Sequence, residues 1–198
     1  MASSGGSKAT VIDALNESPM DLFHLRAVLT SGMGFFTDAY DLFIIGTATA
    51  VLGTQWHLTT SQTSLVNSAT LMAAFIGAFV FGRLADLVGR KRIYGLEAAL
   101  MMVGALISAL APNYGVLVAG RVILGIGVGG DYPVSAVLMS EFANRKDRGK
   151  LVGLVFSMQA LGLIVGPMVG LTLVATNMNP DIAWRLMLGP VSYTHLTL

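Results

Sequence analysis

The sequence contains no cysteine, and only 12% of its 198 residues are charged. The lack of cysteine excludes disulfide bonds, thiolate metal sites and cysteine nucleophiles. About a quarter of the residues in an ordinary soluble domain are charged. The low charge, with 54% hydrophobic residues and a mean hydropathy of +0.71, therefore argues against a soluble or a disordered protein. The net charge of +1 gives no bulk basicity for binding nucleic acid. We expect an all-α integral membrane protein.

Long apolar stretches follow a polar N-terminal segment. A helix of about 20 apolar residues crosses the hydrocarbon core of a bilayer. Residues 1–24 do not meet this requirement, and we expect a cytoplasmic tail there without a cleaved signal peptide. The remaining residues, 25–198, form the expected transmembrane region, with the start of a sixth span near Trp184. The five complete spans predicted before it are approximately Leu25–Leu52, Ser64–Phe81, Ile93–Ala111, Gly115–Ser140 and Leu151–Ala175.

Basic residues gather on one side of these spans. Of the 12 lysines and arginines, all except Arg121 and Arg185 belong to the N-terminal segment and start of span one, or to the connections after spans two and four. The positive-inside rule places these segments in the cytoplasm. We therefore expect a multi-pass protein of the plasma membrane with a cytoplasmic N-terminus.

Polar side chains occur inside the predicted spans, where they are costly and mark functional sites by default. Asp38 and Asp41 are three residues apart and share a face of span one. At ~1.5 Å per residue, Asp38, Asp131 and Gln159 lie at similar depth near the middle of the membrane. Three polar groups on three helices at one depth predict a single site. The alternatives are that they only pair with other groups inside the bundle or that they line a water-filled pore.

Two more charged residues lie within the spans, Glu97 in span three and Arg121 in span four. Arg121 is about 15 Å along the helix from Asp131, which is too far for a direct pair. Its partner is then expected on another helix, such as Asp38. Glycines at intervals of four in spans four and five favour close helix contact: Gly125, Gly129, Gly162, Gly166 and Gly170.

The segment between spans two and three, residues 82–92, reads GRLADLVGRKR. It resembles a loop motif of the major facilitator superfamily, in which a glycine and an aspartate precede Gly-Arg-Lys/Arg. The resemblance implies a gate, in which acidic and basic groups pair with a neighbouring helix end, whereas the alternative is a solvated basic loop. A similar motif follows span four. The gating residues implied by both motifs are Gly82, Asp86, Gly89, Arg90, Lys91, Arg92, Glu141, Arg145 and Arg148.

Three stretches within the spans resemble the phosphate:proton symporters of the same superfamily. They are GFFTDAYDLF at 34–43, GGDYPVSAVLMSE at 129–141 and FSMQ at 156–159, and the resemblance covers about residues 22–187. It implies a major facilitator fold of two six-helix halves, of which this chain is the N-terminal half. It implies substrate binding by Tyr132, Gln159 and Asp131. The proton-coupling residues that it implies are Asp38, Asp131, Asp41, Arg121 and Glu97.

The function implied by the resemblance is secondary active import of inorganic phosphate by proton symport, with alternating access. The alternatives are a symporter for a sugar or an organic acid, a phosphate-sensing receptor, and a non-functional fragment. We expect no enzymatic activity, since the sequence has no catalytic constellation. We also expect no cofactor and no metal, since no histidine has metal-ligand spacing.

The end of the sequence departs from the family pattern. After Gly189 the family continues as an apolar sixth helix, whereas here Pro190 and VSYTHLTL follow. We therefore expect a half that is truncated in helix six. Its expected partners are phosphate, protons, the lipid bilayer and the missing C-terminal half.

Overall fold

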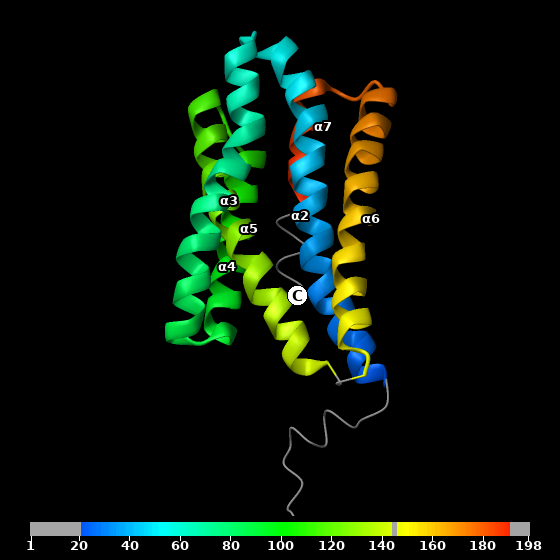
Figure 1. Ribbon diagram of the computed structural model, residues 1–198. Helices are drawn as coiled ribbons and strands as arrows, with labels where there is room; N and C mark the ends of the chain where they lie inside the picture. Colours follow the sequence, from blue (N-terminus) through cyan, green and yellow to red (C-terminus); the bar gives the residue numbers. More distant parts are fainter. Residues whose placement is uncertain (1–20, 144–145, 191–198) are drawn as a thin grey trace, which may run out of the picture.

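The computed structural model describes residues 21–143 and 146–190, and the regular structure within these ranges is helical. The helices run in the order α2 Leu22–Gln55, α3 Thr60–Val88, α4 Arg90–Ala109, α5 Tyr114–Phe142, α6 Arg148–Ala175 and α7 Pro180–Leu188 (Figure 1). They correspond to the five predicted spans and the start of the sixth, and the all-α prediction is confirmed. Most of the predicted N-terminal tail lies outside the described residues.

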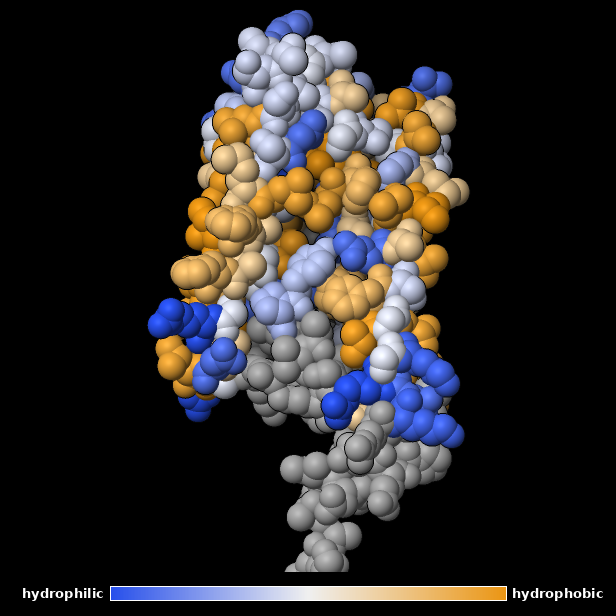
Figure 2. Space-filling view, viewed as in Figure 1, coloured by the Kyte–Doolittle hydropathy of each residue, from blue (hydrophilic) through white to orange (hydrophobic). Residues whose placement is uncertain are grey.

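Four helices are long and apolar enough to cross a membrane, judged by length and composition: His24–Gln55, Thr60–Val88, Tyr114–Pro133 and Arg148–Ala175. The helix predicted as span three is present, but its apolar part, Gly95–Ala109, is shorter. Figure 2 shows hydrophobic side chains across the middle of the molecule and hydrophilic ones at both ends, as expected for a multi-pass membrane protein.

The helix ends follow from local side-chain chemistry. The Asp21 side chain caps α2, and the side chain of Thr59 accepts a hydrogen bond from the Gln62 backbone N–H at the start of α3. Gly89 separates α3 from α4 with a φ of 99°, a left-handed conformation that strains any residue with a Cβ. The glycine of the loop motif therefore has a structural role at the turn between two helices.

Glycines allow the helices to pack closely. Figure 1 shows α3, α4 and α5 grouped on one side of the bundle, with α2 and α6 on the other. A Cβ at Gly129 would overlap the Ala74 carbonyl of α3, and one at Gly162 would overlap the Phe36 carbonyl of α2. The close packing predicted from the glycine spacing is therefore confirmed for α5 against α3 and for α6 against α2.

Helix α7 is fixed to its neighbours at the end where α4 finishes. Arg185 donates hydrogen bonds to the carbonyl oxygens of Ala109 at 2.8 Å and Ala111 at 3.2 Å. Trp184 is fully buried, and its ring packs edge-on against Trp56 with 5.6 Å between centroids. These contacts hold α7 against α2 and α4 and leave the middle of α2 and α5 free to contact each other.

Candidate binding site

Arg121 and Asp41 form a two-pronged ion pair between α5 and α2. Arginine Nη1 lies 2.8 Å from Oδ1 of Asp41, and Nη2 lies 2.6 Å from Oδ2. Both side chains are buried, at 0% and 1% exposure. The sequence had suggested Asp38 as the partner of Arg121, and this suggestion is wrong. Asp41 is about one turn further along α2, which brings it within reach of the long arginine side chain.

A pair of carboxyl groups, Asp38 on α2 and Asp131 on α5, lies next to this ion pair. Asp38 is buried, and no donor among the described residues makes a hydrogen bond to either of its carboxyl oxygens. Asp131 is close enough for a hydrogen bond if one of the two carboxyls carries a proton. Gly34 makes room for this approach, since a Cβ there would lie 3.1 Å from Oδ2 of Asp131.

Glu97 of α4 adds another carboxyl group to the same region. It is fully buried, and among the described residues neither of its side-chain oxygens has a hydrogen-bond partner. It packs directly against Gly130, where a Cβ would overlap its carboxyl group. Both Asp131 and Asp38 lie within its electrostatic reach. The structure thus brings together all the residues that the sequence suggested for proton coupling.

Tyr132 and Gln159 form the polar contact between α5 and α6. The Gln159 amide nitrogen donates to the Tyr132 hydroxyl oxygen at 2.7 Å. The hydroxyl proton of Tyr132 and the amide oxygen of Gln159 then remain to bind a ligand. Tyr132 is half-buried and follows Asp131 directly in the chain, so this pair lies beside the carboxyl groups. The depth argument from the sequence correctly placed Asp38, Asp131 and Gln159 in one region.

The site includes an aromatic residue that sequence reasoning missed. Phe35 is fully buried and meets Tyr132 edge to face, with ring centroids 5.0 Å apart and planes at 85°. Phe156 of α6 packs against the other side of the cluster, 4.8 Å from Phe35 between centroids. Phe35 lies within a stretch that resembled a family motif, but only its position against α5 distinguishes it from a lipid-facing phenylalanine.

The described residues predicted for gating lie at the opposite ends of the helices from Arg185. A Cβ added at Gly82 would lie 3.9 Å from the Pro133 side chain of α5. The side chains of Arg83, Asp86 and Arg92 are exposed. Arg148 is exposed at the start of α6. Of the remaining predicted gating residues, Arg145 lies outside the described residues, and the structure describes the backbone but not the side chains of Arg90, Lys91 and Glu141.

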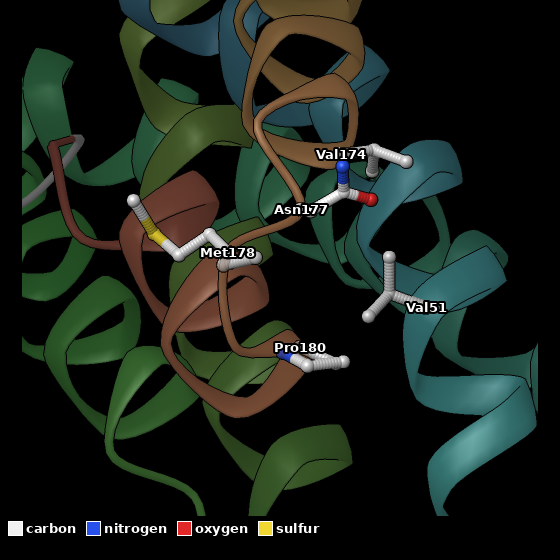
Figure 3. Close-up of a pocket in the computed structure, with 6 residues that line it drawn as sticks. Val51, Val174, Asn177, Met178 and Pro180 are labelled. Carbon is white, nitrogen blue, oxygen red and sulfur yellow. The ribbon is translucent and has the colours of Figure 1, made fainter.

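A separate cavity of about 290 Å³ lies where α2 and α6 end (Figure 3). Its lining includes Val51, Val174, Asn177, Met178 and Pro180, which come from both helices and from the connection to α7. The lining is mostly apolar and contains no charged side chain. It does not provide the donors and acceptors found around Tyr132, so we do not take it as the polar binding site.

The described helices thus form an apolar bundle with buried carboxyl groups and a polar pair between α5 and α6. Residues 27–197 match the family model described as "Sugar (and other) transporter". The chain therefore belongs to this family.

Several curated plant proteins are similar in sequence. "Inorganic phosphate transporter 1-11" of Oryza sativa subsp. japonica is 38% identical over 185 residues, which cover 84% of this chain and 33% of that protein. "Low affinity inorganic phosphate transporter 4" of Petunia hybrida is 36% identical over an alignment of 212 positions, which covers 90% of this chain and 40% of that protein. The chain thus spans well under half the length of these relatives.

Several solved structures are similar in fold. The chain matches a double tryptophan mutant of XylE with a TM-score of 0.79 and 20% identity, covering 88% of this chain and 43% of that one. It matches the inward open conformation of the xylose transporter XylE from E. coli with a TM-score of 0.76 and 20% identity, covering 88% of this chain and 46% of the other. At this identity the likeness establishes the fold, and the expected major facilitator half is confirmed.

Proposed function

We propose that this chain is the N-terminal half of a transporter that imports inorganic phosphate together with protons. The observation that carries the proposal is the hydrogen-bonded pair of Tyr132 and Gln159 beside the buried carboxyls of Asp38 and Asp131. The names of the plant relatives support phosphate as the substrate.

Dihydrogen phosphate fits this set of groups because it both donates and accepts hydrogen bonds. The Tyr132 hydroxyl donates to a phosphate oxygen, while Gln159 and Asp131 accept from the phosphate hydroxyls. Arg121 is already bound by Asp41 and supplies no cationic group to the ligand. Sulfate has no proton near neutral pH and would leave the carboxylate unpaired, so the same site discriminates against it.

Proton coupling follows from charge. An anion placed beside an ionised Asp131 is repelled strongly in a low-dielectric cavity. A proton on Asp131 or Asp38 removes that repulsion, so proton and phosphate favour each other's binding, and by linkage the effect is reciprocal. Glu97, Asp41 and Arg121 set the charge around the pair.

Transport then requires the site to face each side of the membrane in turn. Two halves of a major facilitator protein rock about a site at the middle of the membrane. We assign the 82–92 segment as a gate, together with the similar motif formed by Glu141, Arg145 and Arg148. This gate stabilises one of the two states. By the positive-inside rule, the proposed orientation has this gate and the N-terminus on the cytoplasmic side. The plasma membrane is the proposed location.

A sugar is the second candidate substrate. It is favoured by the description of the family model and by the xylose transporters among the solved structures. The buried carboxyl groups could accept hydrogen bonds from sugar hydroxyls as well as from phosphate hydroxyls. A sugar is uncharged, however, so its uptake would not depend on the ionisation state of the substrate.

The test uses a chimaera in which the chain is joined to the rest of the sixth helix and the C-terminal half of a plant phosphate transporter, reconstituted in proteoliposomes. We expect labelled phosphate to accumulate when a proton gradient is applied and labelled xylose not to accumulate. The 198-residue chain alone should insert but not transport, because its polar site lacks an opposite wall. Phosphate binding without accumulation by the chimaera would favour a receptor, and xylose accumulation would overturn the assignment.

A further inference from the structure

One turn of α2 contacts two neighbouring residues of α5, Asp131 and Tyr132. Asp38 lies against Asp131, and Phe35 packs edge to face against Tyr132 at 5.0 Å between centroids. Phe35 and Asp38 are three residues apart and so are neighbours on the helix surface. Asp131 and Tyr132 are consecutive in sequence. The carboxyl pair and the substrate-binding ring therefore share a single contact between the two helices.

The Phe35 ring has little room to move independently of α2. It is fully buried, and Phe156 of α6 packs against it at 4.8 Å with planes tilted by 58°. Protein interiors are close-packed, so a shift of the helix carries such a ring with it. Tyr132 is thus held at two points, by Phe35 on its ring and by Gln159 on its hydroxyl.

We propose that Phe35 is a positioning residue that couples protonation of the Asp38–Asp131 pair to the orientation of Tyr132. This inference rests on the proposed function. Two ionised carboxylates repel each other and press α2 and α5 apart. A proton held between them removes the repulsion, and the closer approach seats Phe35 against Tyr132. The tyrosine hydroxyl is then fixed beside Gln159, ready to bind the anion.

Other ionisable groups act electrostatically on the same carboxyl pair, and the phenylalanine variants tested below leave these groups in place. Arg121 is neutralised by Asp41 in the buried ion pair. Within the described residues, the titratable and charged groups that face Asp38 come from α2, α4 and α5. They are Asp41, Glu97, Asp131, Tyr132 and, through Asp41, Arg121.

The first measurement is phosphate uptake by the chimaera across pH for Phe35→Leu, with Phe75→Leu on α3, where the side chain is 80% exposed, as the matched control. Loss of the edge-to-face contact should raise the KM for phosphate about 2- to 10-fold at low pH. It should also flatten the dependence of KM on pH, with a smaller effect on the maximal rate. Phe35→Met should restore most of the pH dependence, since a thioether also packs well on an aromatic ring. Phe75→Leu should keep the pH profile.

The second measurement needs neither phosphate nor transport. Ring flipping of labelled Tyr132, followed by NMR in the full chain in bilayers, should be faster in Phe35→Leu than in Phe75→Leu. An unchanged pH profile and flipping rate in Phe35→Leu would overturn the inference, provided that Tyr132→Phe still weakens phosphate binding. If Phe35→Leu fails to fold, Phe35→Ile takes its place, since it also removes the ring contact with Tyr132, and an unchanged pH profile and flipping rate would overturn the inference in the same way. If Tyr132→Phe has no effect either, the proposed function itself fails.

Discussion

Gln159 on α6 donates a hydrogen bond of 2.7 Å to the hydroxyl oxygen of Tyr132 on α5. This bond joins two helices that otherwise meet little in the region of the site. It uses the tyrosine oxygen as an acceptor and so leaves the tyrosine proton for a ligand. The pair supplies one donor and one acceptor, which suits a partly protonated anion better than a fully ionised one.

The first prediction concerns these two ligands. Tyr132→Phe and Gln159→Ala should each weaken phosphate binding to the chimaera by about 1–3 kcal/mol, because each removes a partner of a charged ligand. Equilibrium binding of labelled phosphate measures the effect. Tyr114→Phe, the same change at the start of α5 and far from the site, should leave binding unchanged. Equal losses in Tyr114→Phe and Tyr132→Phe would argue against direct contact.

The buried ion pair predicts that replacing Arg121 lowers the stability of the chain much more than replacing an exposed, paired lysine. Arg121→Met leaves the Asp41 carboxylate buried without its partner, and breaking such a pair typically costs about 3–5 kcal/mol. Thermal unfolding of the chain in detergent should therefore shift strongly to lower temperature. Lys150→Ala removes a pair with Asp147 in which the lysine is 74% exposed, and exposed pairs contribute about 1 kcal/mol or less. Similar shifts in both variants would contradict a buried, energetically important pair.

Much of the fold and part of the site follow from the sequence alone. Hydropathy gave the helices, the rise per residue placed Asp38, Asp131 and Gln159 at one depth, and glycine spacing predicted the close contacts at Gly129. The partner of Arg121 could not be predicted, because the choice between Asp38 and Asp41 depends on how α2 and α5 are rotated against each other. Phe35 was missed for the same reason, since a membrane helix is apolar on buried and lipid-facing sides alike.

Close packing of α5 against α3 gives a third prediction. Gly129→Leu should prevent folding or lower the unfolding temperature markedly, because even a Cβ at this position overlaps the Ala74 carbonyl. Gly95→Leu on α4 is the control, since nothing lies within 4 Å of a Cβ there. Membrane accumulation and thermal unfolding of both variants test the idea, which fails if Gly129→Leu is as stable as Gly95→Leu.

The chain has no cysteine, which makes the proposed orientation simple to test. Ser61→Cys, near the start of α3, should react with an impermeant thiol reagent in intact cells. Lys146→Cys, just before α6, should react only after the cells are opened. Both positions are exposed, so access to each side of the membrane decides the outcome. The reverse pattern would place the N-terminus outside.

The central claim is that a carboxyl at the site binds the proton that allows the anion to bind, and Asp131→Asn tests it most directly. Asparagine resembles the protonated aspartate but cannot release the proton. Phosphate binding and uptake by the chimaera are followed across pH, with Asp38→Asn measured alongside. For Asp131→Asn we predict that phosphate binding survives and depends less on pH, while proton-driven accumulation disappears. Full proton-driven accumulation by Asp131→Asn would contradict the account and move the coupling role to Asp38.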